Sequence, residues 1–349
     1  MESALGWINL QLSEISGIRN SSITLAFDKN DNLYAAYADG AEMSKSTVMK
    51  YDGTVWEVVG NKGFSDGFVL NISLACDKYD IPYVAYFDSA DFGKAAVMRF
   101  IENKWQHFGG KGISLGRTVS SSIAIDANSN IYIAYGDQSY SNRAIVKKFN
   151  GTEWEMVGGR PVSDNGAYNI SAASNKNNTL YIAYGEYEPG RKTSRAILKK
   201  FNGSDWQLIG STDLCEYYIN DISLAFNSDG DPYLAFSDGL YEEKITVIKF
   251  NNTEKEILGM RGFTSGKAYY ISLAIDKDDT VYIAYSDLCN NKKATVMKYN
   301  KKDWETIGDK SVTECEARYT SIATDSKGEA YIAYINCSDH EKAEVFKII

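Results

Sequence analysis

The chain has 349 residues and a formal net charge of −9, with a sequence pI near 5.0. Such an acidic chain has no basic field to attract phosphate backbones or anionic lipids, so we expect neither nucleic acid nor a membrane surface as a partner. Hydrophobic residues make up 44% of the chain and prolines number only 4, which excludes a disordered or collagen-like protein.

Copies of one unit run through the whole sequence. A tyrosine shortly before an alanine–aromatic pair marks each copy, and subtraction gives spacings of 49, 49, 49, 52, 49 and 49 residues. The marking tyrosines are Tyr34, Tyr83, Tyr132, Tyr181, Tyr233, Tyr282 and Tyr331. A period of roughly 40 to 50 residues is typical of β-propellers. The sequence therefore predicts a single all-β domain, residues 1–349, made of seven units.

Each unit is expected to hold four short strands. The first strand, Ile271–Asp276 in the sixth unit, alternates branched apolar residues with small ones. Small side chains at the same place in every copy predict a crowded position, such as the innermost strands around a central channel. These small residues are Thr24, Ser73, Ser122, Ser171, Ser223, Ser272 and Ser321, followed by Ala26, Ala75, Ala124, Ala173, Ala225, Ala274 and Ala323.

A turn opened by Asp or Asn follows the first strand in every unit. In the sixth unit it reads Asp276-Lys-Asp-Asp. An Asp or Asn side chain accepts the backbone N–H two residues on, which is the chemistry of a short hairpin turn. The pattern also resembles the start of a calcium loop, although it lacks the glycine and the distant glutamate of that motif. We expect a plain turn, with calcium as the alternative.

The second strand, Tyr282–Asp287 in the sixth unit, ends on an acid or amide, and the third begins with a base. Such pairs at the base of a hairpin loop predict cross-strand ion pairs, and a ring of repeated ligand sites is the alternative. The acid or amide positions are Asp39, Asp88, Asp137, Glu186, Asp238, Asp287 and Asn336. The basic positions are Lys45, Lys94, Arg143, Arg195, Lys244, Lys293 and Lys342.

The fourth strand carries a tryptophan, which we expect to pack between neighbouring units. Its copies are Trp7, Trp56, Trp105, Trp154, Trp206, Lys255 and Trp304. The last unit has no tryptophan strand after Tyr331, whereas an unpartnered one precedes the first unit. The sequence therefore predicts that Leu5–Leu10 pairs with Ala343–Ile349, which closes a seven-bladed propeller as a 1+3 blade and leaves no open sheet edge.

The repeat resembles that of bacterial seven-bladed propellers, with units of the form S-L-A-I-D, Y-V-A-Y-x-D, K-A-T-V-M-K-F-N-G and W-x-x-V-G. The matching segments in the sixth unit are Ser272–Asp276, Tyr282–Asp287, Lys293–Asn300 and Trp304–Gly308. The resemblance extends over essentially the whole chain. The repeat is also similar to that of NHL-like propellers. It implies a non-catalytic binding or scaffold module. The turn at Ser228–Tyr233 departs from the sialidase pattern, because it has no tryptophan.

Few residues point to catalysis. The chain has only 2 histidines and none of the familiar nucleophile, phosphate-loop or metalloprotease motifs. We therefore expect a binding protein, with a sialidase-type or lyase-type enzyme or a multivalent lectin as alternatives. The N-terminus shows no export signal, and the five cysteines (an odd number) do not recur between units, which favours a reducing, cytoplasmic location.

Function is expected where the copies differ on one face. Loops that join the second and third strands emerge on the same face as the connections between units. Aromatic residues just before the inner strands of units four to seven predict a binding site for a protein or a glycan. We expect the protein to be a monomer. The predicted ligand-binding residues are Tyr168, Tyr217, Tyr218, Asp221, Tyr269, Tyr270, Arg318 and Tyr319.

Cysteines in the last two units suggest a metal site. Cys289 and Cys337 occupy the same loop of units six and seven, Cys315 lies in the connection between them, and His340 follows at a C-x-x-H spacing. Three thiols and an imidazole are able to hold zinc, and a redox-labile disulfide is the alternative. No other cofactor is expected.

Overall fold

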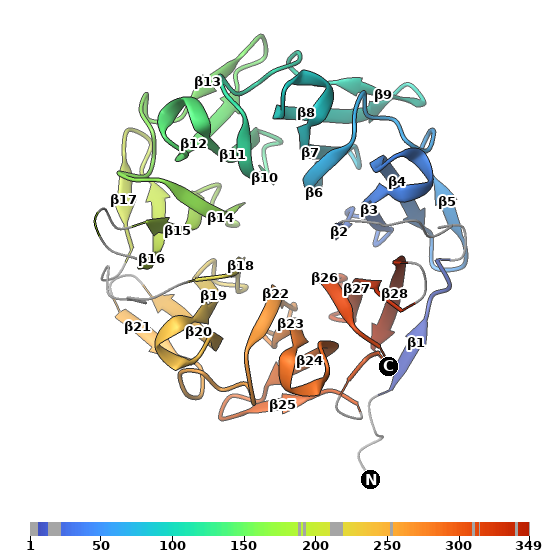
Figure 1. The fold of residues 1–349 in the computed structure, drawn as a ribbon, viewed down its shortest axis with the longest axis vertical. Helices are drawn as coiled ribbons and strands as arrows, with labels where there is room; N and C mark the ends of the chain where they lie inside the picture. The colour runs from blue at the N-terminus through green and yellow to red at the C-terminus, as the bar shows by residue number, and fades with distance from the viewer. Residues whose placement is uncertain are drawn as a thin grey trace.

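The computed structural model is a ring of seven four-stranded antiparallel sheets (Figure 1). It describes residues 6–12, 22–187, 190, 193–209, 219–251, 254–308, 311–313, 315–338 and 341–348. Strands that follow one another in sequence are hydrogen-bonded neighbours within each sheet. The predicted seven-bladed β-propeller is confirmed.

The first three blades each hold one complete meander. Blade 1 contains β2 (Ile23–Phe27), β3 (Leu33–Asp39), β4 (Lys45–Tyr51) and β5 (Trp56–Val58). Blade 2 contains β6 (Val69–Cys76), β7 (Pro82–Asp88), β8 (Lys94–Ile101) and β9 (Lys104–His107). Blade 3 contains β10 (Thr118–Ile125), β11 (Ile131–Asp137), β12 (Arg143–Phe149) and β13 (Trp154–Met156).

The next three blades repeat this order. Blade 4 contains β14 (Ala167–Ser174), β15 (Leu180–Tyr187), β16 (Ser194–Phe201) and β17 (Trp206–Leu208). Blade 5 contains β18 (Ile222–Phe226), β19 (Pro232–Asp238), β20 (Lys244–Asn251) and β21 (Glu254–Ile257). Blade 6 contains β22 (Ala268–Ile275), β23 (Val281–Asp287), β24 (Lys293–Tyr299) and β25 (Trp304–Thr306).

Blade 7 joins the two ends of the chain. It contains β26 (Ala317–Thr324), β27 (Ala330–Asn336), β28 (Lys342–Ile348) and, as its outermost strand, β1 (Trp7–Asn9). Trp7 lies opposite Ile348 in this pairing, and Leu10 N donates to Val345 O at 2.9 Å. Figure 1 shows β1 beside β28, at the outer edge of the ring. The predicted 1+3 closure is confirmed.

In the described ranges, short 3₁₀ turns follow the second strand in five blades. They are η1 (Gly40–Glu42), η2 (Ser89–Asp91), η3 (Gln138–Tyr140), η4 (Gly239–Tyr241) and η5 (Leu288–Asn290). In the part of the chain that the structure describes, no helix is both long and apolar enough to cross a lipid bilayer.

The hydrophobic core lies between blades, because the second strand of each blade is buried on both of its faces. In β11, Ile133 belongs to the cluster shared with blade 2, whereas Ala134 belongs to the cluster shared with blade 4. A further cluster joins Ile23 of blade 1 to Val345 of blade 7. The period-2 alternation of the strand therefore supplies two different interfaces at once.

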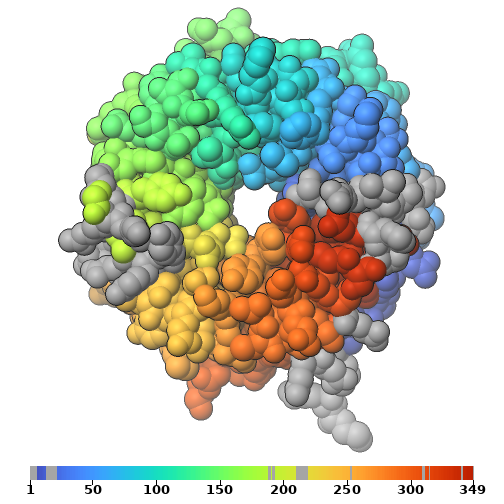
Figure 2. Space-filling model, in the orientation of Figure 1, coloured from blue at the N-terminus to red at the C-terminus, as the bar shows by residue number. Residues whose placement is uncertain are grey.

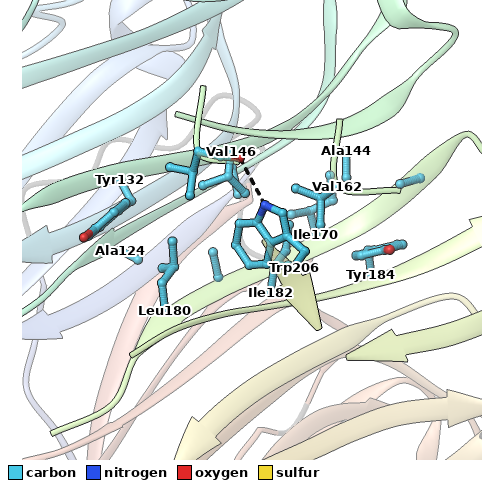
Figure 3. Packing of buried hydrophobic residues seen from close by; sticks show 14 of the residues in the cluster. Ala124, Tyr132, Ala144, Val146, Val162, Ile170, Leu180, Ile182, Tyr184 and Trp206 are labelled. Carbon is cyan, nitrogen blue, oxygen red and sulfur yellow. Dashed lines mark hydrogen bonds between the residues drawn. The ribbon is translucent and has the colours of Figure 1, made fainter. Parts of the chain in front are cut away.

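The tryptophans fill these interfaces, as predicted. In Figure 3 the indole of Trp206 lies among aliphatic side chains that include Val146 and Ile182. Its Nε1 donates to the carbonyl of Val157 in blade 3 at 3.1 Å. Each such tryptophan thereby ties its blade to the preceding one through apolar area and one hydrogen bond.

The recurring serines of the inner strands also join blades. Ser122 Oγ, for example, accepts the backbone N–H of Ala172 in the next blade at 3.0 Å. The same bond is made by Ser73, Ser171, Ser223, Ser272 and Ser321. Adjacent inner strands splay apart around the channel, and a short hydroxyl bridges the backbones where strand pairing is impossible. The sequence indicated the crowding of this position but not this hydrogen bond.

The Asx turns form as predicted. Asp276 Oδ1 accepts the N–H groups of Asp278 and Thr280, each at 2.8 Å. The turns are also linked around the ring, since Ser228 N donates to Asp279 Oδ1 at 2.7 Å. The carboxylates of these turns therefore satisfy backbone donors, as the plain-turn interpretation requires.

Most of the acids expected in cross-strand ion pairs instead cap the 3₁₀ turn that follows their strand. The strand register does place the acid at the end of the second strand opposite the base at the start of the third, as for Asp39 and Lys45. Arg195 pairs with Glu186 at 3.0 Å, but Asp39 accepts the N–H of Ala41 and caps η1. The acids are buried, and a nearby backbone N–H needs less rearrangement than a long lysine side chain that is only partly buried. The recurring acid is thus mainly a loop cap.

Candidate binding site

The loops of the predicted face pack against each other. Ser89, after the second strand of blade 2, donates its N–H to Phe68 O in the connection from blade 1 at 3.1 Å. Phe68 is followed by Val69, whose N–H reaches Ser44 O in the hairpin loop of blade 1 at 2.9 Å. Both kinds of loop therefore share one face, as predicted. Figure 2 shows an opening at the centre of the ring.

Inner strands enter the channel mouth through a β-bulge. The register shifts between Tyr269 and Ser272 in β22 and between Arg318 and Ser321 in β26. Bulged residues adopt the left-handed conformation, with φ of 55° at Tyr270 and 54° at Tyr319. The equivalent residues of blades 2 and 4 are asparagines, which tolerate this conformation. For tyrosine it costs on the order of 1–3 kcal/mol, which marks these two positions as functional candidates.

A cavity of about 300 Å³ opens at this mouth. Its lining includes Asp221, Tyr270 and Tyr319 from blades 5, 6 and 7, and Ser22 and Asn71 from blades 1 and 2. The ring centroids of Tyr270 and Tyr319 are 4.7 Å apart, with the planes tilted by 44°. Two rigid aromatic faces thus stand beside a carboxyl group on one side of the cavity.

Hydrogen bonds across blades hold this group in place. Asp221 Oδ2 accepts the backbone N–H of Tyr270 at 2.7 Å, although 49 residues separate them in the chain. The hydroxyl of Thr320 donates to the carbonyl of Tyr270. The backbone of the strained tyrosine is therefore fixed by blade 5 on one side and by blade 7 on the other.

The carboxyl of Asp221 has unusual electrostatics. Burial raises its pKa to about 7, and the N–H bond from Tyr270 opposes that shift. Burial also raises the pKa of the Tyr270 phenol. Near neutral pH the cavity therefore holds a carboxyl able to gain or lose a proton beside a phenol that keeps its proton.

Other predicted site residues do not line this cavity. Tyr168 packs on Tyr187, with ring centroids 4.6 Å apart. Arg318 Nη2 donates to Glu316 Oε1 at 3.0 Å, and Tyr269 lies opposite Ser286 in the sheet. Tyr217 and Tyr218 fall outside the described residues. Of the eight predicted residues, the structure thus brings Asp221, Tyr270 and Tyr319 together.

Sequence reasoning missed the far wall of the cavity. Ser22 and Asn71 occupy the same repeat position as Tyr270 and Tyr319, but blades 1 and 2 carry no aromatic residue there. Equivalence of repeat position around the ring was the signal that could have identified them, since equivalent positions converge on one axis.

The predicted zinc ligands are spread over two blades. Cys289 packs on Gly266, whereas Cys315 Sγ contacts Asn336 Oδ1 at 2.8 Å in blade 7. Burial raises the pKa of the Cys337 thiol. No group of three potential ligands forms among the described residues, and His340 lies outside them. Zinc at this place therefore stays a prediction.

Comparisons with known proteins reveal similarity of structure alone. No protein-family model matches the sequence, and no curated protein sequence matches it. A protein of unknown function from Dyadobacter fermentans superposes with a TM-score of 0.56 at 12% identity, covering 99% of this chain and 98% of that one.

Two further solved structures are similar at comparable levels. The SapL1 lectin in complex with alpha methyl fucoside has a TM-score of 0.56 at 13% identity, covering 87% of this chain and 98% of that chain. The polysaccharide lyase Uly1 has a TM-score of 0.58 at 9% identity, covering 94% of this chain and 90% of that chain. At such low identity these similarities establish the propeller fold and no shared activity.

Proposed function

We propose that this propeller is a non-catalytic binding protein that holds a glycan at its channel mouth, on the face built from the blade connections. The observation that carries the proposal is the pair of strained tyrosines, Tyr270 and Tyr319, beside Asp221 in one cavity. Tyrosine rings cover the apolar faces of a sugar, and a carboxyl group accepts or donates hydrogen bonds to its hydroxyls.

The repeat pattern favours one irregular site over seven equal ones. The bulge position carries serine or asparagine in blades 1 to 4 and changes to Asp221, Tyr270 and Tyr319 in blades 5 to 7. Because the wall of the channel mouth differs from blade to blade, it suits one ligand that lacks sevenfold symmetry. The remaining predicted residues, Tyr168, Tyr217, Tyr218, Tyr269 and Arg318, are proposed as the outer rim that a longer glycan or a glycosylated protein partner contacts.

Similarity to a lectin structure solved with alpha methyl fucoside supports a glycan over a bare protein surface. The resemblance to bacterial repeat propellers, which implies binding modules, agrees with this function. We propose a monomeric protein, because the ring is closed by its own first strand, so that the edge of β28 is not left for a partner chain.

The test is a glycan array followed by calorimetry with the best ligand. Tyr270→Ala and Tyr319→Ala are each expected to weaken binding by at least tenfold, about 1.4 kcal/mol. Tyr79→Ala, which removes an exposed tyrosine from a turn on the opposite face, should leave affinity unchanged. Several equal sites per chain that ignore Tyr270→Ala would contradict the proposal and support a lectin with repeated sites between blades.

A lyase is the second candidate, because a carboxyl with a pKa of about 7 suits a general base. In β-elimination on a uronate, the Asp221 carboxylate would take the proton from the carbon next to the sugar carboxylate. The C–O bond to the leaving group breaks as a C=C bond forms, and a tyrosine hydroxyl returns a proton to the departing oxygen. An ultraviolet-absorbing unsaturated product, lost in Asp221→Asn, would support this candidate.

A further inference from the structure

A fourth-strand tryptophan is present at every interface between blades except one. The indole Nε1 of a fourth-strand tryptophan donates to a carbonyl of the preceding blade at Trp56, Trp105, Trp154, Trp206 and Trp304. Blade 5 carries Lys255 at this position, and its strand β21 is exposed along its whole length. The junction of blades 4 and 5 therefore lacks the indole of the other junctions, although the ring of Phe250 is buried there.

A cavity of about 720 Å³ lies at this same junction. Its walls include Ile209 and Phe250, whose equivalents flank the indole at other junctions, and the turns at Asn177–Thr179 and Asp229–Asp231. These turns join first to second strands, so the cavity opens on the face opposite the channel mouth. It is separate from the site of Asp221 and Tyr270.

One wall differs from the corresponding wall of blades 3 and 5. Lys200 lies opposite Gln207 in the sheet, whereas Lys148 and Lys249 lie opposite the acids Glu155 and Glu256. Among the described residues, Lys200 forms no ion pair and Gln207 forms no side-chain hydrogen bond, so the ammonium and the amide are available to a ligand.

The charges of the cavity balance. Lys200 stands on the blade 4 side and Asp229 on the blade 5 side, and Asp231 is paired with Lys249 at 3.6 Å. A wall of amides, one ammonium and one free carboxylate offers both donors and acceptors without a net charge. This composition suits a neutral, polyhydroxylated molecule better than an anion or a cation.

Aromatic residues complete the cavity. Phe201 contributes to its lining and remains partly accessible, and Tyr181 also lines it. Aromatic carbon and planar amides around a space of this size are able to hold one or two sugar rings. We infer that the junction of blades 4 and 5 is a second binding site, specific for a neutral carbohydrate, on the face opposite the channel mouth.

The experiment uses the full chain and a panel of glucose, galactose, mannose, fucose and N-acetylglucosamine, with glucuronic acid as the charged comparison. Saturation-transfer NMR and calorimetry measure binding. Gln207→Trp is expected to fill the cavity and reduce the affinity for a neutral sugar at least tenfold. Gln106→Trp places the same side chain at the equivalent position of blade 2, opposite Arg99, and should leave affinity unchanged.

A second variant guards against misfolding. Lys200→Met should lower the affinity for the same sugar severalfold and leave the melting temperature unchanged. Lys298→Met is its control in blade 6. The inference would be overturned if no neutral sugar bound, if glucuronic acid bound more tightly than the neutral sugars, or if Gln207→Trp left the affinity for the neutral sugar unchanged. Binding that is lost in Tyr270→Ala but kept in Gln207→Trp would also overturn it, while supporting the channel-mouth site.

Discussion

Tyr135 is a fully buried tyrosine whose hydroxyl finds no hydrogen-bond partner among the described residues. Phe236 occupies the equivalent position of blade 5 and is equally buried. Because an unsatisfied buried hydroxyl costs about 1–3 kcal/mol, Tyr135→Phe is expected to keep or raise the free energy of unfolding. Urea denaturation checks this expectation.

Tyr334 is the matched control, because its hydroxyl donates to Glu344 in the neighbouring strand. Removal of that donor by Tyr334→Phe should lower the free energy of unfolding by about 1–2 kcal/mol. Equal losses of unfolding free energy in Tyr135→Phe and Tyr334→Phe would contradict the idea that the Tyr135 hydroxyl is an unsatisfied group.

Asp221 makes stability depend on pH. Its pKa is raised from 3.8 to about 7, so between these values the folded chain keeps a proton that the unfolded chain has released. The contribution of Asp221 to the free energy of unfolding therefore falls as pH rises through this window. Asp221→Asn should remove that fall, measured as the difference in melting temperature from the parent at pH 5 and pH 8.

The control for this titration is Asp303→Asn, at an exposed turn residue of blade 6. Its difference from the parent should be the same at both pH values. If Asp221→Asn likewise differs from the parent by the same amount at pH 5 and pH 8, the carboxyl does not titrate in this window.

At the scale of elements, the outer strands act mainly through their tryptophans. Trp105 is 8% exposed, stacks on Phe64 with centroids 4.1 Å apart, and donates to Val59 O at 2.7 Å. Trp105→Ala should lower the free energy of unfolding by about 3–5 kcal/mol, since it leaves a cavity between blades 1 and 2. Lys255→Ala, at the equivalent but exposed position, should change it by less than about 0.5 kcal/mol.

Denaturant unfolding of both variants measures these effects. Similar losses in Trp105→Ala and Lys255→Ala would contradict the idea that blades are joined by the indole. A junction that tolerates lysine is also one at which a cavity for a ligand costs little stability.

At the scale of the whole molecule, ring closure rests on β1. Leu10 N donates to Val345 O, Trp56 Nε1 donates to Leu10 O at 3.0 Å, and Leu12 is buried between blades 7 and 1. Deletion of residues 1–11 should expose the edge of β28 and cause aggregation with a lower melting temperature. Light scattering and thermal denaturation measure both.

A peptide of residues 1–12 added in trans provides the control. It should pair with β28, reduce the aggregation and restore part of the melting temperature. A truncated chain that remains monomeric and as heat-stable as the parent would show that closure does not depend on β1.

The sequence alone determined the number of blades, their strands and their closure. These features follow from local patterns repeated at a nearly constant period, such as the alternation in Tyr282–Asp287 and the tryptophan 27 residues before six of the seven marking tyrosines. The prediction that both kinds of loop emerge on one face was also correct, because the direction of each strand decides on which face a loop emerges.

Only the tertiary structure decided which side chains meet. Tyr269 and Tyr270 are neighbours in sequence, yet the bulge and the left-handed backbone bring Tyr270 to the cavity wall and leave Tyr269 opposite Ser286. The partner of Asp221 is a backbone N–H 49 residues away. Bulges change side-chain direction within one residue, and contacts between blades depend on the ring as a whole, so neither is encoded in a local pattern.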